Sequence, residues 1–215
     1  MSDAAPPREI PLFPIRGCIL PPGEHLPLNV FEPRYLNMVD DARAGVGVIG
    51  VIQPRDEGPK ARPALEPVGC VGRIASYEET DDGRYLIVLA GLARFRVIEE
   101  LDTATPYRVA RVDYAEFEDD LRPRPLADPA DRTAFLALLR RFFEQEGMEA
   151  DWPSIDQAPL NAVVNKVAMA VPFEPAAKQA LLEAAGGAER AEALSALMSA
   201  ALDAESDGPG SADRH

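Results

Sequence analysis

The sequence has few of the side chains that most enzymes use for catalysis. Its 215 residues include only two cysteines and two histidines. His215 is the last residue, so His25 is the one histidine placed where it could act as a general base. Cys18 and Cys70 lie far apart, and two cysteines with one usable histidine do not make a zinc site. We therefore expect no metal and no cofactor.

Lysine is also scarce, which restricts nucleotide chemistry. The three lysines are Lys60, Lys166 and Lys178, and none of them ends a glycine-rich phosphate-binding loop. Lys166 and Lys178 fall in predicted helices and Lys60 falls in a predicted loop, so none is placed for a serine and lysine hydrolase. No glycine-rich dinucleotide-binding turn follows a predicted strand. We therefore expect a protein that acts independently of ATP and is not an enzyme.

Long apolar runs are absent, and the charge is one-sided. No segment approaches the roughly 20 apolar residues of a membrane-spanning helix, and the first ten residues lack the apolar core of a signal peptide. Acidic residues number 36 against 22 basic ones, which gives a net charge of -14. Negative charge repels anionic lipids and phosphate backbones, so we expect neither a membrane nor a nucleic-acid partner. The expected location is the cytoplasm, with both cysteines as reduced thiols.

The first half of the chain has the pattern of strands and turns. Asp82-Gly83 is a tight-turn signal that predicts an antiparallel hairpin. Pro33 suits the first position of a helix and Gly45 its end, so a helix is predicted between them. The proline-rich segment 53–67 is predicted to be an exposed loop. The short apolar runs that predict strands are 26–31, 46–53, 68–77, 85–92, 93–99 and 107–114.

The second half is rich in alanine and leucine at helical spacing. Amphipathic helices of this kind bury one another's apolar faces and form a compact bundle. Four helices are predicted: one from Asp128, one from Pro159 to Pro172, one from Pro175 to Gly186-Gly187, and one that carries its apolar positions from Ala191 to Ala201.

The change in pattern predicts the domain organisation. The fold class is α+β, with a β-rich lobe over residues 9–122 that contains one inserted helix, followed by a helical bundle over 123–202. The end segments 1–8 and 203–215 lack apolar periodicity and are predicted to be disordered.

Two polar groups stand out within this apolar frame. Glu32 lies at the start of the first predicted helix, where the positive end of the helix dipole favours its charge. Arg94 and Arg96 lie on one face of a predicted strand. Glu32 paired with one of these arginines would hold the helix to the sheet, and the alternative is a polar anchor at the edge of a binding surface.

Several segments resemble the N-terminal substrate-recognition domain of Lon proteases. The similarity covers about residues 10–202, with mild departures such as Asn29, where the family usually has histidine. The segments that carry it are Ile10–Arg16 (IPLFPIR), Leu20–Tyr35 (LPPGEHLPLNVFEPRY), Asp82–Tyr85 (DGRY), Gly91–Arg96 (GLARFR), Leu160–Phe173 (LNAVVNKVAMAVPF) and Lys178–Glu183 (KQALLE).

The resemblance implies a PUA-like pseudo-barrel followed by a helical bundle, without the ATPase and protease domains of full-length Lon. It implies a role in protein quality control, in which the domain binds unfolded or partly folded polypeptides or acts as an adaptor for a protease or chaperone. We expect apolar patches rimmed by charge to make the contact. The candidate residues are Leu12, Phe13, Leu26, Leu28, Glu32, Arg34, Tyr35, Arg94, Phe95 and Arg96, together with the 53–67 loop.

Two alternatives from other functional classes remain open at this point. Cys18 and His25 flank a proline-rich turn and form the one nucleophile-and-base pair the sequence could build, as in a small cysteine hydrolase. PUA-like barrels elsewhere bind RNA, and Arg94, Arg96 and Arg111 could form a local basic patch despite the net negative charge. The sequence does not predict an oligomeric state.

Overall fold

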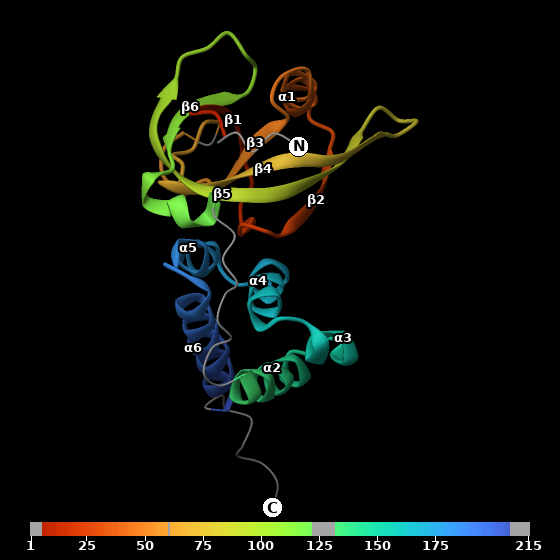
Figure 1. Cartoon of the computed structure of the whole chain (residues 1–215), viewed down its shortest axis with the longest axis vertical. Helices are drawn as coiled ribbons and strands as arrows, with labels where there is room; N and C mark the ends of the chain where they lie inside the picture. The colour runs from red at the N-terminus through yellow and green to blue at the C-terminus, as the bar shows by residue number, and fades with distance from the viewer. Residues whose placement is uncertain (1–5, 60, 122–131, 207–215) are drawn as a thin grey trace, which may run out of the picture. The chain divides into compact units, whose positions relative to one another are not determined.

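The computed structural model describes residues 6–59, 61–121 and 132–206. Contacts divide the chain into two units: the first contains the strands, the helices among and directly after them, and Val171–Leu182, and the second contains the helices between Arg132 and Ala170 and the last helix from Gly187. The elements in Figure 1 are β1 (Glu9–Pro14), β2 (His25–Val30), α1 (Pro33–Ala44), β3 (Val48–Ile52), β4 (Val68–Glu79), β5 (Tyr85–Leu101), β6 (Arg108–Asp113), the 3-10 helix η1 (Ala115–Leu121), α2 (Arg132–Gln145), α3 (Trp152–Gln157), α4 (Leu160–Ala170), α5 (Pro175–Glu183) and α6 (Gly187–Ser206).

The six strands of the first unit form one sheet that closes into a pseudo-barrel. Their order is β2-β5-β4-β3-β1-β6, and β6 also pairs with β5. Strand β5 has 17 residues, which is long enough for its first part to pair with β2 and its last part with β6. All pairs are antiparallel except β1 with β3. The predicted α+β class and the pseudo-barrel with one inserted helix are confirmed.

The β4–β5 hairpin turns at the predicted position. Gly83 has a φ of 78°, a conformation that glycine adopts without the steric cost of a Cβ atom. In Figure 1 this hairpin projects to the right of the barrel. The predicted strands 85–92 and 93–99 are one continuous strand, because Gly91 near their junction stays in the ladder and pairs with Gly72 of β4. Strand β1 was not predicted, because Pro11 and Pro14 interrupt its short apolar pattern.

Helix α1 begins at Pro33 and ends before Gly45, as the sequence predicted. Tyr35 packs against Phe13 of β1, with ring centroids 4.4 Å apart. The acidic pair Asp40 and Asp41 then accepts hydrogen bonds from two tyrosines, Tyr85 (3.2 Å) and Tyr107 (2.7 Å). Tyr35 therefore holds the first turn of α1 to β1, and Asp40 and Asp41 hold the following part of the helix through hydrogen bonds.

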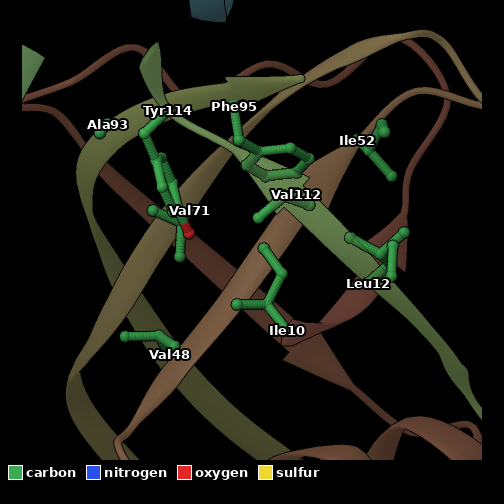
Figure 2. Packing of buried hydrophobic residues seen from close by; sticks show 10 residues of the cluster. Ile10, Leu12, Val48, Ile52, Val71, Ala93, Phe95, Val112 and Tyr114 are labelled. Atoms are coloured by element: carbon green, nitrogen blue, oxygen red, sulfur yellow. The ribbon is translucent and has the colours of Figure 1, made fainter. Parts of the chain in front are cut away.

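The barrel interior is filled by aliphatic and aromatic side chains from every part of the sheet except β2. Phe95 is the largest fully buried side chain. Gly69 lies against its ring, since a Cβ at Gly69 would come within 2.6 Å of Phe95 Cζ. Figure 2 shows this cluster, which consists of Ile10, Leu12, Val48, Ile52, Val71, Ala93, Phe95, Ala110, Val112 and Tyr114.

Helix α5 belongs to the first unit, although the sequence analysis placed it in a helical lobe over 123–202. Buried polar side chains hold it there. Gln53 donates to Gln179 Oε1 (3.1 Å) and to the carbonyl of Pro175 (3.0 Å), and Gln179 donates to the carbonyl of Val68 (3.0 Å). Hydrogen bonds between buried amides specify a docking position that apolar spacing alone does not reveal.

The second unit contains α2, α3, α4 and α6, which confirms the helical part of the fold. Helix α6 packs against both α2 and α4. A buried hydrogen bond of 2.9 Å from Arg190 of α6 to Asn165 of α4 accompanies the apolar contact. The short helix α3 was not predicted; its N-cap residue is Asp151, whose carboxylate accepts a hydrogen bond from the main-chain N–H of Ser154.

Several predictions about the ends of elements lie partly outside the described residues. The predicted start of the second-half helices at Asp128 is one of them, and so are most of the segments 1–8 and 203–215 that were predicted to be disordered. Residues 203–206, however, form the end of α6. Over the ranges that the structure describes, no helix combines the length and apolarity needed to cross a bilayer.

Candidate functional site

An open groove of about 490 Å³ runs over strands β2, β5 and β4 of the first unit. Three neighbouring residues from each strand border it. Strand β2 forms the edge of the sheet, and Pro27 is tolerated in its middle because an edge strand can spare one N–H. The bordering residues are Pro27, Leu28, Asn29, Ser76, Tyr77, Glu78, Leu86, Ile87 and Val88.

Strand register shows which side chains face the groove. Val88 lies opposite both Pro27 and Ser76, and Leu86 lies opposite both Asn29 and Glu78. Because side chains alternate along a strand, these six occupy one face of the sheet. Their neighbours Leu28, Ile87 and Tyr77 are opposite one another in the next row, so they border the groove with their backbone and turn their side chains to the other face.

The groove face is exposed and largely apolar. Leu86 is 40% exposed, and Pro27 on the edge strand is exposed as well. Val88 is half-buried between them. Exposed aliphatic side chains that adjoin one another on a sheet are the kind of surface that binds other polypeptides. Hydroxyl and amide groups of Ser76 and Asn29 add hydrogen-bonding capacity to this apolar face.

One charged side chain, Glu78, borders the groove. It is exposed, and it makes no hydrogen bond or ion pair with any residue among those the structure describes. Arg84, in the turn of the β4–β5 hairpin, and Arg73, on β4, have other partners. Arg84 pairs with Asp82, and Arg73 donates to the carbonyl of Val46 (3.2 Å). The electrostatic character of the groove is therefore negative.

Four of the side chains predicted to contact a ligand are in the core instead. Leu12 and Phe95 are fully buried in the barrel, and Phe13 and Tyr35 stack against each other with exposures of 8% and 7%. Their apolar character serves packing, and they reach no surface in this structure.

Leu26 and Leu28 lie on β2, beside the groove. Both are half-buried, and their register partners Leu89 and Ile87 are buried. Alternation therefore places both leucine side chains on the face opposite the groove. Of the two, Leu28 borders the groove through its backbone.

The predicted clasp between Glu32 and a strand arginine is wrong. Glu32 pairs with its neighbour Arg34 at 2.7 Å, and both are largely exposed. Arg94 pairs instead with Asp120 and Arg96 with Glu116, both on η1. The acidic run after β6, and not the start of α1, therefore supplies the partners of these two arginines.

Arg94 has a structural role. It is 4% exposed, and its Nε and Nη2 donate to the Asp120 carboxylate while its own main-chain N–H donates to the same group. Its Nη1 donates to the carbonyl of Leu182 at the end of α5 (3.2 Å), and its guanidinium lies over the ring of Phe117. Arg94 thus joins β5, η1 and α5 within the first unit.

The arginines considered for RNA binding are neutralised by acidic partners. Besides the pairs of Arg94 and Arg96, Arg111 forms ion pairs with both Glu9 and Glu99. A second polar pocket of about 190 Å³ is bordered by Arg34, Arg62 and Arg108, but Glu32 and Glu100 pair with these arginines. Neither place offers the excess positive charge that phosphate recognition requires.

Cys18 and His25 do not form an activated pair. Burial raises the pKa of the Cys18 thiol, and the charge that opposes this effect comes from Lys178 of α5. His25 is exposed at the start of β2. A nucleophilic cysteine needs a lowered pKa, so this thiol is in the wrong state for catalysis. Within the described part of the chain, no three His, Cys, Asp or Glu side chains gather as metal ligands.

Of the residues that border the groove, only Leu28 was among the candidates from the sequence. The signal was in β5, where Leu86, Ile87, Val88 and Leu89 are apolar without alternation. A strand with one face on a core and the other in water alternates, so an unbroken apolar run indicates that its second face is covered or binds something.

The fold is of the α+β class, and an open, largely apolar groove lies over β2, β5 and β4. The sequence matches the family described as the ATP-dependent protease La (LON) substrate-binding domain over residues 9–200. The chain therefore belongs to this family, and the resemblance found in the sequence is confirmed.

Curated relatives and solved structures agree with this assignment. Lon protease 2 of Myxococcus xanthus is 38% identical over 113 residues, and Lon protease 2 of Thermus thermophilus is 27% identical over 205 residues. These matches cover 51% and 91% of this chain but only 13% and 24% of the relatives. The chain thus spans less than a quarter of their length.

Two solved structures share the fold. A Lon N-terminal domain protein from Xanthomonas campestris aligns with a TM-score of 0.61 and 25% identity, covering 87% of this chain and 97% of that one. The N-terminal domain of Lon protease from the Mycobacterium avium complex aligns with a TM-score of 0.65 at 18% identity, covering 89% and 98%. The second likeness concerns the fold alone.

Proposed function

We propose that this chain is a non-catalytic polypeptide-recognition module that binds extended, apolar segments of unfolded or partly folded proteins in the β2–β5–β4 groove. The observation that carries the proposal is the exposed apolar face around Leu86 and Val88. Membership of a substrate-binding family supports it, because the substrates of Lon-type proteases are polypeptides.

The size of the groove supports weak and tolerant binding. Fully burying one aliphatic side chain contributes about 1.5–3 kcal/mol, and the groove side chains Leu86 and Val88 are already partly covered. Association costs several kcal/mol in lost freedom, so two or three such contacts leave affinities of about millimolar. Weak binding of many segments suits a protein that surveys unfolded chains.

The module acts without ATP in this proposal, as an adaptor or a protective binder in the cytoplasm. Its second partner is then a protease or a chaperone that receives the bound polypeptide. The hydrolase and RNA-binding alternatives gain no support, because burial raises the pKa of the Cys18 thiol and the arginines of the proposed patch are paired with acids.

Binding of a fluorescent, unstructured peptide that carries a short aliphatic run tests the proposal by fluorescence anisotropy. Leu86→Asp places a charge on the groove face and should weaken binding about tenfold or more, since an unpaired charge would be covered by the peptide. Ile98→Asp is the matched control, because Ile98 is a 58% exposed aliphatic residue elsewhere on β5.

The control variant should bind as the wild type does. The proposal is wrong if the wild-type chain binds no such peptide, or if the two variants weaken binding equally.

A further inference from the structure

We infer that the groove selects apolar segments flanked by lysine or arginine over the same segments flanked by glutamate or aspartate. This inference rests on the proposed function and adds to it the class of polypeptide that the groove prefers. The juxtaposition that carries it is a single unpaired carboxylate, Glu78, beside the exposed aliphatic side chain of Leu86.

Glu78 is placed to meet a residue next to a bound apolar side chain. It lies directly opposite Leu86 on the neighbouring strand, and Asn29 completes the same row. Residues opposite each other on adjacent strands have Cβ atoms about 5 Å apart. A bound segment that covers Leu86 therefore brings its adjoining side chain within reach of the Glu78 carboxylate.

The surroundings of Glu78 strengthen the negative potential. Glu79, Asp81 and Asp82 follow it at the end of β4 and in the turn. Arg84 is the cation of this turn, and its guanidinium is already paired with Asp82. With more acids than bases in this hairpin and a net charge of -14 for the chain, an incoming cation is attracted from a distance as well as at contact.

The arginine that could neutralise this region from α1 lies elsewhere. The guanidinium of Arg43 lies over the ring of Tyr77, 3.5 Å from its centroid. Tyr77 alternates with Glu78, so Arg43 sits on the opposite face of the sheet. The groove face thus keeps its negative charge in the folded unit.

The expected preference is modest, because the contact is exposed to water. One solvent-exposed ion pair changes an equilibrium by about two- to fivefold, and a like-charge contact opposes binding by a similar factor. A lysine-flanked peptide should therefore bind about five- to twentyfold more tightly than its glutamate-flanked counterpart at low salt. Raising the ionic strength to about 1 M shortens the screening length to about 3 Å and should remove most of the difference.

Three peptides with one aliphatic core test the inference. They carry lysine, glutamine or glutamate at both flanks, and their affinities are measured by fluorescence anisotropy at low and high salt. The full chain is used as wild type and as Glu78→Gln. Asp102→Asn is the control, since it removes one exposed carboxylate from the first unit after β5, outside the groove.

The lysine-flanked peptide should bind most tightly, the glutamine-flanked peptide less tightly and the glutamate-flanked peptide most weakly. Glu78→Gln should reduce the ratio between the strongest and the weakest affinity at least twofold, while Asp102→Asn should leave this ratio unchanged. If all three peptides bind equally and Leu86→Asp still abolishes this binding, the charge preference is overturned and the proposed function stands. Binding of none of them overturns both. A dimer of the chain that disappears in Leu86→Asp assigns the groove to a second copy and also overturns the inference.

Discussion

Removing the carboxylate of Asp120 should destabilise the first unit far more than removing a similar carboxylate nearby. In the wild type, Asp120 accepts hydrogen bonds from Arg94 Nε (2.8 Å), Arg94 Nη2 (2.9 Å) and the main-chain N–H of Arg94 (3.0 Å). The side chains of Arg94 and Asp120 are 5% and 12% exposed. Asp120→Ala leaves the buried guanidinium without its counter-charge.

The magnitude follows from this burial. Breaking a buried ion pair by removing one partner costs about 3–5 kcal/mol, because the remaining charge stays in a poorly solvated place. Arg94 retains the Leu182 carbonyl and the Phe117 ring, so the lower part of that range is expected. Each kcal/mol lowers the unfolding midpoint of a domain of this size by about 2–4 °C, which gives a decrease of about 10 °C.

Thermal unfolding followed by circular dichroism measures the effect. Glu116→Ala is the matched control, because it removes a carboxylate of the same helix η1 from Arg96, and the side chains of that pair are 42% and 52% exposed. An exposed pair contributes about 0–1 kcal/mol, so the control midpoint should fall by no more than about 3 °C. Equal midpoints for the two variants would refute the reasoning about burial.

Two further predictions concern titrating side chains. Burial and the hydrogen bond to Asp41 raise the pKa of Tyr107 to about 12 from its ordinary value of 10.0. The folded state therefore keeps this proton to a higher pH than the unfolded state does, and the free energy of unfolding should fall between about pH 10 and 12. Tyr107→Phe should lose less stability over that interval in denaturant titrations, and an unchanged pH dependence would contradict this origin. Burial raises the pKa of the Cys18 thiol, so its alkylation by iodoacetamide at neutral pH should be slower than that of a cysteine in a free peptide. Mass spectrometry measures the rate of this alkylation. Alkylation faster than that of the peptide would instead favour the hydrolase alternative.

The local features of the fold could be predicted from the sequence because short-range chemistry determines them. Pro33 and Gly45 mark the ends of α1, and Asp82-Gly83 marks the hairpin. Strand β1 was missed, because its prolines remove the usual strand signal and only pairing with β3 and β6 makes it a strand.

The docking of α5 could not be predicted, because buried polar side chains determine it. Gln179 and Lys178 interrupt the apolar face of this helix, and in isolation they suggest exposure to solvent. Their burial follows from groups contributed by residues more than a hundred positions earlier, such as Gln53 and the carbonyl of Val68. Long-range hydrogen-bond partners leave no periodic trace in a sequence.

The place of the candidate groove could not be predicted from the sequence. An apolar contact surface rimmed by charge was expected, and β2 was among the expected elements. The largest apolar side chains of the recognised motif, Leu12, Phe13 and Phe95, fill the core. The alternation of β5 with its partners, which brings Leu86 and Val88 to the outer face, requires the strand register and so becomes visible only in the folded sheet.

Mapping the contact by nuclear magnetic resonance shows whether a polypeptide binds the β2–β5–β4 groove. The 15N-labelled chain is titrated with the lysine-flanked aliphatic peptide, and the amide shifts are followed residue by residue. Binding in the groove should give saturable changes concentrated at Ser76, Glu78, Leu86 and Val88. Changes confined to other parts of the chain, or none at saturating peptide, would contradict it.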